Sequence, residues 1–285
     1  MVHTYDDDEL LVNYDDACIY GRDLRLIYNP SEEGGGGGGW LNDACIHFAL
    51  KRLLADHQKK RAQHAHSNSL LLMDPAVLSF FMHSCQTDDM EDLMDFCQGF
   101  RNFGGVAVIF LPVNDSMTTL PQRVGQQGSH WSLLLATKLN KSSKDTASSL
   151  VFFHFDSVTH SGNERIARQI AAAFLKAWKI CQANTTDLKP ALCYHECTAV
   201  PQQVNGYDCG IHVLLTIEAL LPVVDTPQDA SDTATTDLPT LYTNAIVSHF
   251  FELGRQDHKE SIADSCQKIR QRLADDIQTL AQVYR

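Results

Sequence analysis

The sequence predicts an α+β fold, with helices packed on a mixed sheet and one apolar helix at its centre. Apolar runs with the length of strands alternate with segments of helical periodicity along the chain. The run from Ile211 to Leu221 is apolar nearly all round, as is typical of a helix covered on more than one side. We expect a single domain, 1–285, because a chain of 285 residues can bury one large core and candidate functional residues from distant segments must converge.

The first half of the chain predicts two helices and an interior strand. Helical spacing of apolar residues covers 40–54, with Asn42 or Asp43 near the start as the cap. The Asp-Pro pair at 74–75 combines a favoured N-cap with a favoured first helical residue, so a second helix begins there. The run 105–112 is continuously apolar between a glycine and a proline, which favours a strand inside the sheet.

The second half predicts a hairpin followed by further helices and a short strand. Strand-like runs at 130–137 and 150–155 flank a polar loop, so we expect them to pair antiparallel. Asn163 is expected to cap a helix with apolar residues at steps of four, and a short strand at 198–200 leads to the central apolar helix. The apolar stripe between 262 and 280 predicts a terminal helix that acts as a structural strut.

The most informative segment is V-P-Q-Q-V-N-G-Y-D-C-G at 200–210, because the central helix follows it directly. This places Cys209 at the N-terminus of that helix. The first helical turn leaves N–H groups unpaired and carries the positive end of the macrodipole, so a thiol there is biased toward the nucleophilic thiolate. A free cysteine is more often a small core residue, so a base is needed to make Cys209 a catalytic candidate.

His130 and Asp156 supply that base and its partner. In a hairpin folded about Ser143, residues whose numbers have the same sum face each other, and His130 then lies opposite Asp156. Asp156 would orient the imidazole while the other ring nitrogen takes the thiol proton. Gln203 lies in the extended segment before the helix, where its amide can donate to a developing oxyanion together with the N–H of Cys209.

The order His130, Asp156, Gln203, Cys209 resembles the Ulp/SENP family of cysteine proteases, which process ubiquitin-like modifiers. The likeness covers most of the chain and rests on separate blocks: W-L-N-D at 40–43, H-W-S-L at 130–133, F-F-H-F-D-S at 152–157 and Q-x-x-x-x-D-C-G at 203–210. The spelling W-L-N-D, the L-P-V-N-D stretch at 111–115 and the tyrosine in N-G-Y-D-C-G are similar to the deneddylating branch of the family.

The resemblance implies an Ulp/adenain-type fold and cleavage after a C-terminal Gly-Gly through a thioester. It implies that Trp40 and Trp131 form a narrow tunnel around the glycine tail. Asp43 is expected to pair with an arginine of the modifier, with a helix-capping carboxylate as the alternative. The implied partner is the neddylation modifier, with SUMO as the alternative, and no cofactor is implied.

Two other function classes share parts of this pattern. Some effector acetyltransferases have the same His, acid, Cys order on a related fold, but they need a pocket for a polyphosphate-bearing ligand, and the acidic balance of this chain disfavours one. A catalytically inactive module that only binds a modifier is the other alternative. Such a module has no need for all of the catalytic groups together.

Charge and cysteine content exclude further classes. With 35 acidic and 23 basic residues, the net charge of −12 argues against nucleic acid and anionic membrane as partners. The acidic start at 1–8 does not fit a secretory signal, and nine scattered cysteines fit a reducing compartment, so we expect an intracellular monomer. The C-Y-H-E-C stretch at 193–197 lacks a second ligand pair, so no metal site is predicted. Low-complexity insertions are expected at 30–39, 140–149 and 226–238.

Overall fold

The computed structural model describes most of the chain, in the segments 5–28, 39–61, 70–86, 106–117, 130–139, 149–181, 192–225, 238–253 and 258–283. The three predicted insertions, 30–39, 140–149 and 226–238, lie outside these segments except for their last residues. Among the described residues, no helix is both long enough and apolar enough to cross a bilayer.

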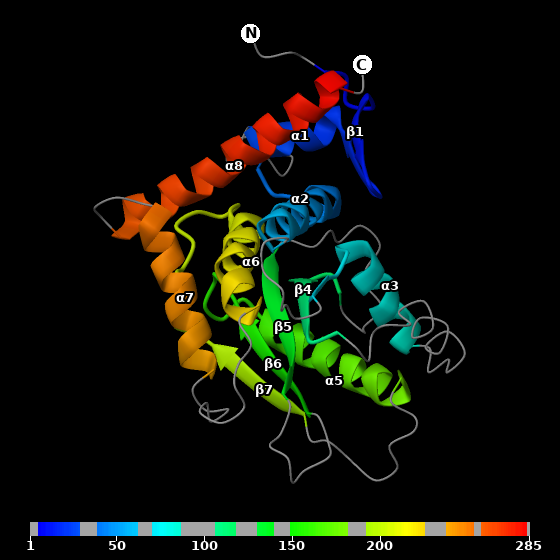
Figure 1. Ribbon diagram of the computed structural model, residues 1–285, viewed down its shortest axis with the longest axis vertical. Helices are drawn as coiled ribbons and strands as arrows, with labels where there is room; N and C mark the ends of the chain where they lie inside the picture. The colour runs from blue at the N-terminus through cyan, green and yellow to red at the C-terminus, as the bar shows by residue number, and fades with distance from the viewer. Residues whose placement is uncertain are drawn as a thin grey trace.

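The core of the fold is a five-stranded mixed sheet of order β3-β4-β5-β6-β7 (Figure 1). Its strands are β3 (Leu70–Leu72), β4 (Val108–Asn114), β5 (Trp131–Leu139), β6 (Ser149–Phe155) and β7 (Cys193–Cys197). The outer pairs β3–β4 and β6–β7 are parallel, whereas β4–β5 and β5–β6 are antiparallel. This arrangement confirms the predicted α+β class. β4 is buried along its whole length between two neighbours, as the continuous apolar run predicted.

Helices cover both faces of this sheet, and further elements close one end (Figure 1). They are α1 (Gly21–Tyr28), α2 (Asp43–Arg61), α3 (Pro75–Gln86), α5 (Asn163–Cys181), α6 (Cys209–Asp225), α7 (Leu238–Leu253) and α8 (His258–Val283), with a small hairpin of β1 (Leu10–Tyr14) and β2 (Ala17–Tyr20). The two helices α5 and α6 both pack on β4 and β5, from opposite faces. Packed also against α2, α7 and α8, α6 is the central helix that its apolar sequence predicted.

The hairpin of β5 and β6 forms with a register that differs from the predicted one. Folding about Ser143 would place Leu133 opposite Phe153, but Leu133 pairs with Phe155, two residues further along. Side chains alternate between faces with a period of two, so this shift leaves every side chain on its predicted face. His130 and Asp156 therefore still lie at the same end of the hairpin, just before β5 and just after β6.

Two of the three predicted helix caps are present. The Oδ1 of Asn42 accepts a hydrogen bond from the N–H of Cys45 at 3.0 Å, so α2 begins at Asp43 and not at residue 40. Asp74 caps α3 in the same way through the N–H of Ala76 at 2.8 Å. These caps form because donor and acceptor are only two or three residues apart in the chain.

The prediction that Asn163 caps α5 is wrong. The capping oxygen belongs to Ser161, whose Oγ accepts from the N–H of Asn163 at 3.1 Å. Asn163 is fully buried and faces the sheet, where its amide donates to the Oγ of Ser132 at 3.1 Å. The amide nitrogen of Asn163 finds partners there, whereas its Oδ1 is buried without a hydrogen-bond partner among the described residues, so it caps no helix.

The strand predicted at 198–200 is also misplaced. The strand before the central helix is β7, Cys193–Cys197, which pairs in parallel with β6 from Val151 to Phe155. Thr198 and Ala199 are exposed beyond the end of β6, so they have no strand to pair with. The terminal helix α8 buries its predicted stripe, with Leu280 only partly covered, and packs on α1, α6, α7 and β1, as expected of a strut.

Candidate active site

Cys209 is the first residue of α6. The carbonyl of Asp208 accepts from the N–H of His212 at 2.9 Å, which makes Asp208 the N-cap residue and Cys209 the first residue of the helical turn. A side chain at Gly210 would bring a Cβ within 3.1 Å of the Cβ of Leu41 and 3.2 Å of the Cδ1 of Ile46. The glycine after the cysteine therefore lets α6 begin in close contact with α2.

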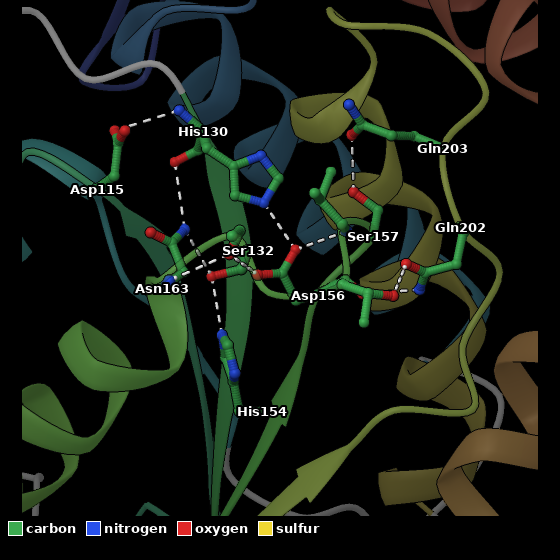
Figure 2. Close-up of polar contacts among 12 residues, drawn as sticks. Asp115, His130, Ser132, His154, Asp156, Ser157, Asn163, Gln202 and Gln203 are labelled. Carbon is green, nitrogen blue, oxygen red and sulfur yellow. Dashed lines mark hydrogen bonds and ion pairs between the residues drawn. The ribbon is translucent and has the colours of Figure 1, made fainter.

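His130 lies beside both Asp156 and Cys209. The Nε2 of His130 is 2.6 Å from the Oδ1 of Asp156 (Figure 2), and Cys209 lies close enough to the imidazole to raise its pKa. Asp156 is itself fixed by the N–H of Val158 at 2.8 Å and by the hydroxyl of Ser161. The predicted group of nucleophile, base and orienting acid is thus assembled at the end of the hairpin.

The charges of this group stabilise one another. Burial lowers the pKa of His130, but the hydrogen bonds and charges of Asp156 and Cys209 outweigh it and raise the pKa to about 10. Burial raises the pKa of Asp156, yet the pairing with His130 and the hydrogen bonds from Ser161 and Val158 hold it below its usual range. At neutral pH the imidazole is therefore protonated, and a protonated imidazole can donate a proton to a leaving group.

The main chain of His130 is held by groups that the sequence reasoning missed. Its N–H donates to the Oδ1 of Asp115 at 3.2 Å, and its carbonyl accepts from the N–H of Asp115 at 3.1 Å and from the Nδ2 of Asn163 at 3.3 Å (Figure 2). The anchors on both sides fix the position from which the imidazole reaches Asp156.

A buried polar chain supports Asn163 from below (Figure 2). The Oγ of Ser132 accepts from Asn163 and lies 2.9 Å from the Nε2 of His154, whose Nδ1 lies 2.8 Å from Glu196. Ser132 is 1% exposed and His154 is 0% exposed, so each polar group depends on these partners. The signal for this chain was present in the sequence as isolated polar residues within the apolar runs of β5 and β6.

Gln203 is oriented by its neighbours on the segment that leads to α6. Its N–H donates to the carbonyl of Ser157 at 2.9 Å, and its Oε1 accepts from the Ser157 hydroxyl at 2.9 Å (Figure 2). Its Nε2 donates to the carbonyl of Asn205 at 2.7 Å. An amide nitrogen carries two N–H groups, so a second one is available to an oxyanion. The catalytic role of Gln203 stays a prediction.

The two tryptophans have different environments. Trp40 is 40% exposed, and its Nε1 donates to the carbonyl of Gly206 in the nucleophile segment at 2.7 Å. Trp131 is only 4% exposed, and its Nε1 donates to the carbonyl of Leu41 at 2.8 Å. Trp40 thus has a free face for a ligand, whereas Trp131 lines a small cavity that also borders Cys209. Their roles in binding stay predictions.

Asp43 is exposed at the start of α2, where the side chain of Asn42 provides the cap. Local desolvation and the nearby carboxylate of Asp74 raise the pKa of Asp43. Two carboxylates placed close together favour a cationic ligand between them. Asn42 is the N-cap residue, but the Asp43 carboxylate also accepts a backbone hydrogen bond in the first turn, so its binding of a basic group stays a prediction beside the capping alternative.

Within the described segments, no three or more His, Cys, Asp or Glu side chains are grouped so that they could hold a metal ion. The C-Y-H-E-C stretch forms β7, where the Sγ of Cys193 is 3.6 Å from the Nε2 of His195. Glu196 points to His154 and Tyr194 instead.

Comparison with known proteins identifies the protein family to which this chain belongs. Residues 39–245 match the family described as the Ulp1 protease family, C-terminal catalytic domain. The chain belongs to the Ulp1 protease family. It is therefore a cysteine peptidase, and the matched region contains the four predicted catalytic residues.

Curated relatives of this family resemble most of the chain. NEDD8-specific protease 1 of Arabidopsis thaliana is 30% identical over 77% of this chain and 78% of its own length. Probable sentrin-specific protease 8 of Dictyostelium discoideum is 32% identical over 76% of this chain and 77% of its own length. The solved structure of a de-sumoylating protease has the same fold, with a TM-score of 0.61 at 19% identity over 96% of this chain and 92% of that one. The expected Ulp-type fold is thereby confirmed.

Proposed function

We propose that the protein cleaves the bond after the C-terminal Gly-Gly of a ubiquitin-like modifier, with the neddylation modifier NEDD8 as the preferred one. The observation that carries the proposal is the contact of His130 with both Asp156 and Cys209 at the N-terminus of a buried helix. An exposed tryptophan, Trp40, is tied to the same segment and offers a flat surface beside it.

The reaction has two halves. The Cys209 sulfur attacks the glycyl carbonyl carbon, and the amine leaves with a proton from His130 as the C–N bond breaks. His130 then takes a proton from water, the oxygen attacks the thioester carbonyl, and the C–S bond breaks, which releases the modifier's carboxylate and restores the Cys209 sulfur beside the protonated His130. Gln203 and the N–H of Cys209 stabilise the oxyanion in both halves. Asp156 keeps Nε2 of His130 occupied, so that Nδ1 faces the sulfur.

Selection of the modifier must use residues near its tail, because many modifiers share the terminal glycines. Exposed Asp43, with Asp74 close by, supports pairing with a basic residue just before the glycines. The W-L-N-D and N-G-Y-D-C-G blocks and the relatives named NEDD8-specific protease 1 support NEDD8 over SUMO.

The test compares initial rates on matched fluorogenic substrates made from NEDD8, SUMO and ubiquitin. We expect the highest kcat/KM with NEDD8, and Asp43→Asn should reduce it while leaving the rate on a short Gly-Gly peptide substrate unchanged. Faster cleavage of SUMO would overturn the preference and leave the peptidase mechanism intact. Labelling of Cys209 by none of the three tail-directed probes would overturn the proposed substrate class.

We also propose that the protein works as an intracellular monomer without nucleic acid or membrane. The net charge of −12 supports this proposal, because a negatively charged protein is repelled by anionic polymers and anionic surfaces. Sedimentation velocity and fluorescence imaging of a tagged full chain test the oligomeric state and the location.

A further inference from the structure

One arginine of the terminal helix α8 lies inside the molecule, next to the nucleophile. Arg270 is 2% exposed, and its Nε and Nη2 both donate to the Oδ1 of Asp208, at 2.8 and 2.7 Å. Asp208 is the residue immediately before Cys209 and the N-cap of α6. The buried ion pair thus reaches the backbone that carries the reactive sulfur.

The remaining donors of Arg270 bind backbone carbonyls from separate segments. Its Nη1 donates to the carbonyls of Leu26 at 3.1 Å and Ile27 at 3.4 Å, within α1. Its Nη2 donates to the carbonyl of Gly39 at 2.7 Å, directly before Trp40. One side chain therefore joins the nucleophile segment to α1 and to the residue that precedes the exposed tryptophan.

Hydrogen bonds through Asn205 connect the Arg270–Asp208 ion pair to Gln203. The second oxygen of Asp208 accepts from the Nδ2 of Asn205 at 2.7 Å, and the Oδ1 of Asn205 accepts from the N–H of Asp208 at 3.0 Å. The carbonyl of Asn205 accepts from the Nε2 of Gln203 at 2.7 Å. If Asp208 moved, Asn205 would move with it and shift Gln203, the proposed oxyanion donor. The same movement would displace Cys209, the next residue in the chain.

We infer that Arg270 is a positioning residue for catalysis, which fixes Cys209 and Gln203 through Asp208 and fixes Trp40 through Gly39. This inference rests on the proposed hydrolysis. Arg270 lies beyond residues 39–245, the part of the chain that matches the family model, so the family match assigns it no role. Through the contacts of Arg270, the terminal helix α8 helps to position the residues of the active site in addition to acting as a strut.

The chemistry of the guanidinium explains why an arginine is needed here. Its planar fork reaches a carboxylate and several carbonyls in fixed directions, whereas the ammonium of lysine provides the same charge at one point. A role limited to helix packing would not require these contacts, since apolar side chains can replace a buried ion pair with little loss of stability. Arg270 therefore fixes the position of the segment before Cys209 and does not merely supply a positive charge.

The test compares Arg270→Lys with Arg272→Met, a control two residues further along the same helix. Arg272 pairs with Glu218 at 2.9 and 2.8 Å on the exposed side, away from the nucleophile segment. A second variant, Asp208→Asn combined with Arg270→Met, removes both buried charges and keeps the test valid where the lysine variant does not fold. All variants are assayed below their melting temperatures, with kcat and KM on NEDD8 substrate and the rate of iodoacetamide labelling at Cys209 mapped by mass spectrometry.

We expect the Arg270 variants to lose about a hundredfold in kcat, as misplacement of reacting groups by about an ångström does, while Arg272→Met stays at the level of the unmodified protein. Folded Arg270 variants that keep kcat within about threefold would overturn the inference. If the unmodified protein cleaves no modifier, the proposed function fails, and the labelling rate decides alone. Slower labelling of Cys209 in the Arg270 variants then supports positioning, and unchanged labelling overturns it.

Discussion

Replacement of Asp156 by asparagine isolates the effect of charge on His130. The Oδ1 of asparagine can still accept from His130 and from the N–H of Val158, and its amide can face the hydroxyl of Ser161, so the geometry is kept. A hydrogen bond between charged groups contributes about 1.5–3 kcal/mol, of which the neutral amide retains a part. At about 1.4 kcal/mol for each factor of ten, Asp156→Asn should lower kcat/KM by about 10- to 100-fold.

The pH profile gives a second, more specific measure of the same change. The pKa of His130 is raised to about 10, so the protonated imidazole is present below that pH and is lost as the pH rises through it. Without the Asp156 charge this pKa should fall by about one to two units. The alkaline limb of kcat/KM should therefore move to lower pH in Asp156→Asn.

Stability should change on the acid side in the same variant. The pKa of Asp156 is held below its ordinary value of 3.8, so its pairing stabilises the fold above that pH and the contribution disappears as the pH falls through the lower folded value. Asp156→Asn should remove this part of the acid dependence.

The matched control is Glu218→Gln, a carboxylate-to-amide change further along α6 that affects Arg272 and not His130. The assay is hydrolysis of a fluorogenic NEDD8 substrate over a range of pH, with unfolding by urea in parallel. An unchanged alkaline limb, or a kcat/KM equal to that of the control, would show that Asp156 is not the charge partner of His130.

Further substitutions test other parts of the site. Cys209→Ala should abolish turnover but retain modifier binding, measured by calorimetry, and residual turnover would end the thiol mechanism. Gln203→Ala should lower kcat by about a hundredfold with KM unchanged, and a change in KM alone would assign Gln203 to binding. Trp40→Ala should raise KM because the exposed ring is lost, as steady-state kinetics would show. Gly210→Ala should destabilise the protein by about 1–3 kcal/mol in urea, because the added Cβ meets Leu41 at 3.1 Å, and an unchanged midpoint would contradict that packing.

Local features of the sequence predicted local features of the fold. The caps by Asn42 and Asp74 depend on hydrogen bonds to residues two or three positions away, so the chain specifies them without knowledge of its packing. The apolar circumference of the central helix likewise indicated its burial. The pairing of His130 with Asp156 survived an error in register because alternation with a period of two preserves the face of each strand residue.

Long-range contacts decided what the sequence could not. Asn163 looked like a cap, but its amide faces a buried strand and bonds to Ser132 instead. Arg270 lies outside the apolar stripe that predicted α8, and only the packing of α8 brings it to Asp208, 62 positions away in the chain. Hydrogen-bond partners of a buried polar group are those that folding brings within reach, and no local pattern encodes them. The sequence alone therefore predicts which chemical groups meet at the candidate site, whereas folding decides which other residues hold those groups in place.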